Sequence, residues 1–187
     1  MKRSTLTLVV IAAVVLILVF TGIGSYNRLV SAETSVDNKF ADIDVNLQRR
    51  ADLIPNLVST VKGYAAHETE VLTAIADARS RLAGAGTADE KAAADAELNG
   101  ALSRLLVVVE NYPNLKADAQ FTRLMDELSG TENRIAVARK DYNAAVTDYN
   151  MKIRKFPAAI FAGMFGFEKK SLFQAAEGAE KVPEVKF

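Results

Sequence analysis

Residues that could carry out catalysis or bind a metal are few in this chain of 187 amino acids, which has one histidine, His67, and no cysteine. His67-Glu68 begins a zinc-protease pattern, but the second histidine that this motif needs is absent, and position 71 is valine. A di-iron site in a helical bundle would need two Glu-x-x-His sets. No serine or threonine has an evident base beside it. We therefore predict a protein that is not an enzyme, with no catalytic residue, no metal ligand and no cofactor, although carboxylate-only binding of calcium or magnesium is left open. His67 is interpreted as a helix-surface residue.

The charge balance also narrows the class of partner. The chain has 23 basic and 23 acidic residues, so its formal net charge is zero and no overall positive field favours nucleic acid. Alanine, leucine, valine and charged residues dominate, and this composition favours helices.

The most apolar stretch lies near the N-terminus. Residues 6–23 carry no charge, and thirteen of these eighteen are Leu, Ile, Val or Phe. As a helix the stretch would be ~27 Å long, close to the thickness of the hydrocarbon core of a bilayer. It is longer than the apolar region of a signal peptide. We predict a five-residue flank (1–5) and an uncleaved, single-pass anchor in the inner membrane (6–25), with the body outside the cytoplasm.

The rest of the chain predicts four helices. Apolar residues at helical spacing run from Tyr26 to Leu47, and this first helix is expected to falter near residues 49–52 because Pro55 disfavours helical geometry. The second helix is expected over 56–83. The third is expected over 88–110, after a capping box formed by Thr87 and Glu90.

The fourth predicted helix, 117–155, has the clearest repeat. Aromatic or branched apolar residues recur every seven positions without interruption at Gly130. They are Phe121, Leu128, Ile135, Tyr142, Tyr149 and Phe156. A sustained heptad indicates packing of helix on helix, as in a coiled coil. Because the connections are short, we predict an all-α fold: an antiparallel up-and-down four-helix bundle (26–156) preceded by one N-terminal transmembrane helix and followed by an apolar segment and tail (157–187).

Three sets of residues are candidate sites in this arrangement. The turns farthest from the membrane form a hypothetical partner-binding tip, or alternatively only cap helix ends. Three asparagines that each follow a tyrosine are expected to pair across helices and fix their register, or alternatively to line a ligand pocket. An aromatic segment is expected either to contact the bilayer or to close the end of the bundle. The tip comprises Arg49, Arg50, Asp52, Asn56, Asn111, Tyr112 and Lys116; the asparagines are Asn27, Asn143 and Asn150; the segment contains Ile160, Phe161, Met164, Phe165 and Phe167.

Several long motifs resemble the LemA family of bacterial membrane proteins. They are RRADLIPNLVSTVKGYAAHE (49–68), NYPNLKADAQF (111–121), ELSGTENRIAVARKDYNAAVTDYN (127–150) and the closing PEVKF. The resemblance implies an N-terminal membrane helix and an antiparallel four-helix bundle, and it implies no enzymatic activity or set of functional residues. We therefore expect a non-catalytic scaffold or adaptor that is integral to the membrane and presents its bundle to a protein partner. A ligand-sensing bundle that acts through a separate protein is the alternative, and self-association is left open.

Overall fold

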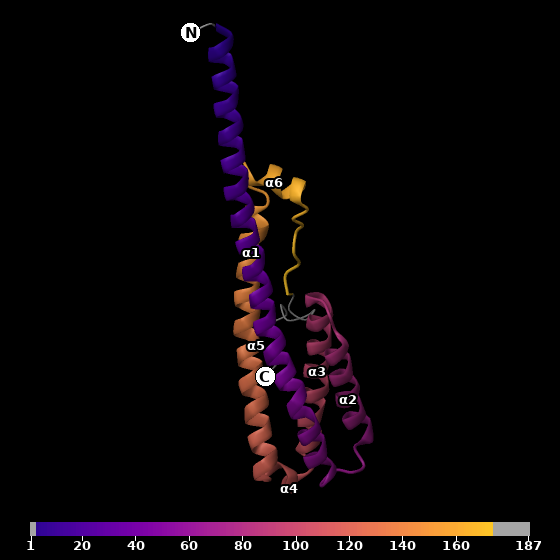
Figure 1. Cartoon of the computed structure of the whole chain (residues 1–187). Coiled ribbons are helices and arrows are strands. Elements are labelled where there is room, and N and C mark those ends of the chain that lie inside the picture. Colours follow the sequence, from indigo (N-terminus) through magenta and orange to yellow (C-terminus); the bar gives the residue numbers. More distant parts are fainter. Residues whose placement is uncertain (1–2, 174–187) are drawn as a thin grey trace, which may run out of the picture. The chain divides into compact units, whose positions relative to one another are not determined.

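The computed structural model describes residues 3–173, and it describes side chains from Thr7 onward. Within this range the regular elements are all helices (Figure 1). They are α1 (Arg3–Lys62), α2 (Thr69–Gly84), α3 (Ala88–Val109), α4 (Pro113–Lys116), α5 (Ala119–Lys152) and α6 (Ala158–Phe165). The all-helical class is therefore confirmed. Of the predicted apolar segment and tail (157–187), residues 174–187 lie outside the described part.

The chain divides into two compact units. Among the described residues, the first contains 3–38 together with 144–170, and the second contains 39–143 together with 171–173. Helices α1 and α5 contribute to both units.

Helix α1 contains the predicted membrane anchor. Its side chains from Leu8 to Phe20 are strongly exposed, with Phe20 at 72%. Among the described helices it is the one long and apolar enough to cross a membrane. An apolar surface of this kind is stable when lipid covers it, because water would otherwise have to solvate it.

The predicted break near residues 49–52 is wrong. Helix α1 passes through Pro55 and ends at Lys62, so the chain reverses over residues 63–68 and α2 begins at Thr69. A proline inside a helix costs about 3 kcal/mol. Burial of the apolar face on both sides of Pro55 exceeds this cost, because a buried leucine or isoleucine contributes about 1.5–3 kcal/mol. The buried residues are Ala51, Ile54, Leu57 and Val61.

The predicted start of α3 is confirmed. The Thr87 hydroxyl accepts from the Glu90 backbone N–H at 3.2 Å, and the Glu90 carboxylate accepts from the backbone N–H groups of Thr87 and Gly86 at 3.0 and 2.9 Å. These backbone donors, that of Thr87 first, lower the pKa of Glu90. The capping box gives α3 a defined start directly after the turn that ends α2.

Helix α5 is one helix across Gly130, as predicted. The heptad positions Phe121, Leu128, Ile135, Tyr142 and Tyr149 are buried. Phe156, the last member of the predicted repeat, is 83% exposed. It lies beyond the end of α5 at Lys152, so the heptad has no helix to continue in.

Candidate functional site

Arg50 is the centre of a buried polar cluster in the second unit, and the prediction that it lies in an exposed turn is wrong. It is 3% exposed and lies inside a long helix, well before its end at Lys62. Its guanidinium donates from Nη1 to Asp95 of α3 at 2.7 Å and to Glu132 of α5, and from Nη2 to Asn99 of α3. Arg50 therefore links α1 to both α3 and α5.

Asp95 is the more deeply buried of the two acidic partners of Arg50. Its side chain is 2% exposed, and burial raises the pKa of its carboxyl, while the Arg50 guanidinium opposes that rise. A second ion pair joins Lys91 of α3 to Asp44 of α1. A buried charge is tolerated when it is paired and hydrogen-bonded. The Arg50 and Asp95 side chains are therefore buried between helices and do not present their charges at the surface.

The other predicted tip residues are divided between two places. Arg49, Asp52 and Asn56 are exposed on α1, before its end at Lys62. Asp52 does not cap a helix, as had been one expectation, and it accepts instead from the Gln48 amide at 2.8 Å.

Asn111, Tyr112 and Lys116 do lie in a connection, the one between α3 and α5, and the structure joins this connection to residues 63–68. The Tyr112 hydroxyl donates to Glu68 at 2.9 Å, and the Tyr64 hydroxyl donates to Asp118 at 2.8 Å. Both carboxylate acceptors raise the pKa of the tyrosine that they bind. We call residues 63–68 and 110–118 the paired turns.

His67 lies in the first of the paired turns, so the prediction that it lies on a helix surface is wrong, although it is exposed as expected. In the part of the chain with described side chains, no group of three or more His, Asp or Glu is arranged to hold a metal ion.

Asn143 and Asn150 bind backbone rather than a neighbouring helix. The Asn150 amide donates to the Lys170 carbonyl at 2.9 Å and accepts from the Lys170 N–H at 3.0 Å. Asn143 makes the same pair of bonds to Phe173, at 3.0 and 2.8 Å. Each amide therefore satisfies both backbone polar groups of one residue in a segment without regular secondary structure, an arrangement that holds the chain independently of its side chains.

The tyrosine before each asparagine adds a further bond. Tyr142 donates to the Ser171 carbonyl at 3.0 Å within the second unit, and Tyr149 donates to the Glu168 carbonyl at 2.9 Å within the first. We call residues 168–173 the C-terminal strap. Asn27 is exposed on α1, whereas the predicted pairing across helices required it to be buried. The seven-residue repeat of Tyr-Asn indicated a shared function for Asn143 and Asn150, but a backbone partner leaves no signal in the sequence.

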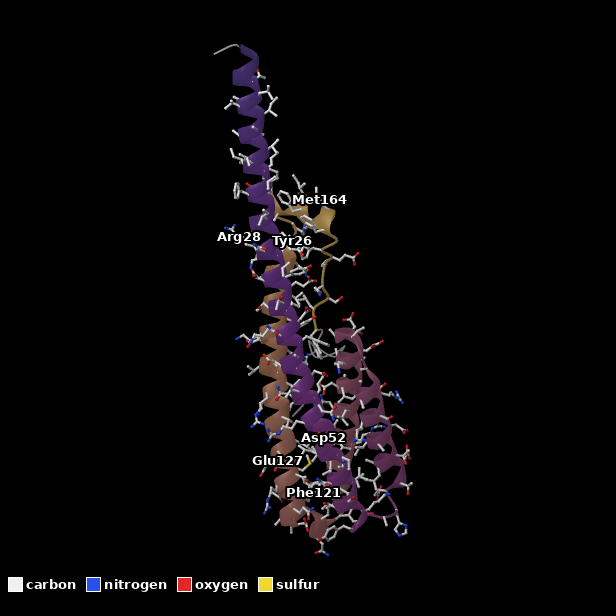
Figure 2. All side chains as sticks on the ribbon, viewed as in Figure 1. Tyr26, Arg28, Asp52, Phe121, Glu127 and Met164 are labelled. Atoms are coloured by element: carbon white, nitrogen blue, oxygen red, sulfur yellow. The ribbon has the colours of Figure 1, made fainter. Side chains whose placement is uncertain are left out.

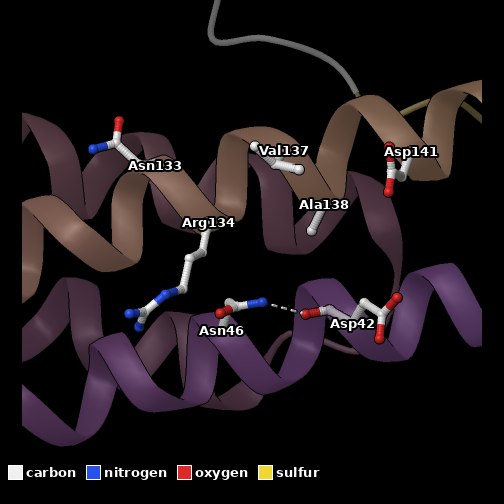
Figure 3. Close-up of a pocket in the computed structure, with 7 residues that line it drawn as sticks. All are labelled: Asp42, Asn46, Asn133, Arg134, Val137, Ala138 and Asp141. Atoms are coloured by element: carbon white, nitrogen blue, oxygen red, sulfur yellow. Dashed lines mark hydrogen bonds between the residues drawn. The ribbon is translucent and has the colours of Figure 1, made fainter.

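A groove in the second unit lies between α1 and α5 (Figure 3). It has a volume of about 430 Å³, and within it the Asn46 amide donates to the Asp42 carbonyl at 2.7 Å. The residues that line it are Asp42, Asn46, Asn133, Arg134, Val137, Ala138 and Asp141. Neither Asn143 nor Asn150 lines this groove, so it does not coincide with the predicted ligand pocket.

The predicted aromatic segment forms α6 and the residues after it, in the first unit (Figure 1). Phe161 packs against Gly22 of α1, where an added Cβ would lie 2.9 Å from the ring. Tyr26 of α1 makes edge-to-face contacts with Phe165 and Phe167, with ring centroids 5.0 and 5.8 Å apart. Gly166 ends the helix with φ = 75°, a left-handed conformation that glycine adopts without strain.

These features define a class: an all-helical protein with an N-terminal helix fit to span a membrane and a body held by interhelical ion pairs and a bound strap. The LemA family model matches residues 39–187, so the chain belongs to the LemA family.

Curated relatives are consistent with this assignment. The chain is 30% identical to magnetosome protein MamQ 2 of Paramagnetospirillum magneticum and 28% identical to MamQ of Magnetospirillum gryphiswaldense, over 80% and 79% of its length. It spans 64% of the length of each of these two proteins. It is also 27% identical to protein LemA of Metamycoplasma hominis, over 84% of this chain and 73% of that one.

Proposed function

We propose that this protein is a membrane-anchored, non-catalytic scaffold that presents a helical body to a protein partner. The observation that carries the proposal is α1, in which the exposed apolar stretch and the buried stripe of the body belong to one helix. Such a helix holds the body at the membrane in which its apolar stretch is embedded. The body lies outside the cytoplasm in this proposal, and the anchor crosses the inner membrane once.

The body is proposed to be an antiparallel four-helix bundle. It is made from the second half of α1, the first part of α5, and helices α2 and α3. The ion pairs of Arg50 and Lys91, and the bond from Arg79 of α2 to the Ala51 carbonyl at 2.8 Å, support this arrangement. The short turns that connect α2 to α3 and α3 to α5 favour antiparallel neighbours.

The paired turns are the proposed partner-binding surface, in place of the tip expected around Arg49 and Arg50. Hydrogen bonds from Tyr64 and Tyr112 join the two turns, so their backbone is pre-organised. Binding of a partner would therefore cost less conformational entropy. His67, Asn111 and Lys116 are exposed there.

A photo-crosslinking amino acid at His67 or Asn111 in living cells tests this surface. We expect each to trap the same protein, and the same probe at Val107, which is 71% exposed on α3, to trap none. Capture at Val107 but not at the paired turns would show that a helix face binds the partner. A topology reporter fused to the C-terminus tests the orientation, since a reporter active only in the cytoplasm should be silent.

A second candidate function is binding of a small polar ligand, and the groove of Figure 3 favours it because acidic, basic and amide residues line it. It predicts a ligand-dependent rise in melting temperature that Arg134→Ala abolishes. If no compound in a metabolite screen raises the melting temperature of the unmodified protein, this function is rejected.

A further inference from the structure

Helix α6 is apolar on both of its faces. Its eight residues, AAIFAGMF, include no polar side chain. Ala162 is buried and Phe161 is half-buried against α1, as expected for an inner face. The opposite face holds Ile160 and Met164, one helical turn apart, which are 58% and 68% exposed. A surface helix normally has a polar outer face, so the outer face of α6 needs a cover.

The position of α6 identifies that cover. Its contacts on α1 are Gly22 and Tyr26, and these residues lie where the apolar stretch 6–23 ends. Tyr26 is of the type that collects at the boundary between hydrocarbon and headgroups. Figure 2 labels Tyr26 on α1 and Met164 on α6, and Phe165, the residue after Met164, contacts the Tyr26 ring. Since both segments belong to the first unit, α6 lies at the level at which a membrane around α1 would end.

Charges on both sides of α6 complement a negatively charged membrane surface. Arg154 and Lys155 precede the helix and Lys169 follows it, and all three side chains are exposed. Glu168 is the exposed acidic residue nearby, whereas Lys170 already pairs with Glu33 and Asp37 at 3.1 and 3.4 Å. Lysine and arginine near an anionic leaflet each contribute about 1 kcal/mol.

We propose that α6 is a second membrane-contact element, which lies in the interface of the bilayer and binds anionic lipid headgroups through its flanking basic residues. Ile160 and Met164 enter the boundary of the acyl chains, while Arg154, Lys155 and Lys169 contact phosphates. This inference rests on the membrane anchoring of α1 that the proposed function assigns. It adds a lipid preference that a single transmembrane helix would not confer.

The chain contains no tryptophan, so a single introduced tryptophan is a clean reporter of depth. The full-length protein is reconstituted in vesicles of phosphatidylcholine with or without phosphatidylglycerol, each also prepared with brominated acyl chains that quench tryptophan. The reporters are Met164→Trp for α6, Val14→Trp for the anchor and Val107→Trp for a body residue expected to remain in water. Circular dichroism checks that each variant keeps its helix content.

Met164→Trp is expected to show blue-shifted emission and strong quenching in vesicles with phosphatidylglycerol, and weaker quenching without it. Replacing Lys155 and Lys169 together by glutamine should reduce the ratio of membrane-inserted to water-exposed α6, read from the quenching of Met164→Trp, about 25-fold, at about fivefold per charge. Lys116→Gln, at an exposed lysine of the paired turns, should change nothing.

Two outcomes separate this inference from the proposed function. If Val14→Trp is quenched but Met164→Trp matches Val107→Trp in both vesicles, α6 is not a membrane element while the anchor stands. If Val14→Trp is also unquenched, the anchoring itself is wrong. Equal quenching of Met164→Trp with and without phosphatidylglycerol would overturn the preference for anionic lipid.

Discussion

Replacing Arg50 by methionine should destabilise the second unit strongly. The substitution keeps most of the apolar stem of the side chain but removes the cation beside Asp95, which is 2% exposed and cannot regain water. Breaking one side of a buried ion pair costs about 3–5 kcal/mol. Glu132, whose side chain is 39% exposed, remains partly hydrated and should add little to this cost.

Hydrogen exchange of the full-length protein in detergent micelles, read by mass spectrometry, measures this loss locally. At 1.36 kcal/mol for each power of ten, amides of α3 around Leu98 and Leu105 should lose about two to four powers of ten in protection. The double variant Arg50→Met/Asp95→Leu should recover most of that protection, because the lone carboxylate is then absent. A single variant that loses less than a factor of about ten would refute the reasoning.

The pH dependence gives an independent check of the cause. Burial holds the pKa of Asp95 above its unfolded value, and loss of Arg50 removes the attraction that opposes the rise. Ionised Asp95 therefore lowers the free energy of unfolding by its full amount at pH values above the folded pKa. This loss becomes smaller as the pH is lowered towards the pKa of the unfolded chain, about 4. The gap between Arg50→Met and the unmodified protein should narrow from pH 7 to pH 5. A constant gap would mean that the charge on Asp95 is not responsible.

Three further substitutions test other parts of the structure. Pro55→Ala, at an exposed site inside α1, should raise the free energy of unfolding by up to about 3 kcal/mol in urea titrations; no gain would indicate that a new helix starts there. Thr87→Ala should lower it by about 1 kcal/mol through loss of the capping box, and an unchanged urea midpoint would contradict the role of this cap. Asn150→Ala removes two hydrogen bonds to Lys170, so trypsin should cleave after Lys170 about tenfold faster. Asn27→Ala should be cleaved at the rate of the unmodified protein. Equal cleavage rates for the two variants would show that the strap is held in another way.

Elements with a regular local pattern were predicted well. The capping box of α3, the course of α5 across Gly130 and the apolar stretch of α1 all follow from residues within a few positions of one another. A helix repeats its contacts every three to four residues, so spacing alone reveals which face is buried. The heptad failed only at Phe156, where the helix itself has ended.

The candidate sites were predicted less well, because their partners are distant in the chain. Arg50 seemed suited to a turn since Pro55 follows it, yet Asp95 and Glu132, 45 and 82 residues away, hold it in a buried position. Asn143 and Asn150 were expected to bind another helix, and their partners are backbone groups of the strap.

The sequence by itself therefore determined the helical class, the stretch apolar and long enough to span a membrane, the faces of the helices and the family, all of which depend on residue type and short-range spacing. The tertiary structure decided where α1 ends, that Arg50 is buried, what the asparagines bind and that α6 lies beside Gly22 and Tyr26. The physical reason is that packing free energy outweighs the local preference at Pro55. In addition, a hydrogen bond to a backbone group depends on where the chain passes and not on which side chain it carries there.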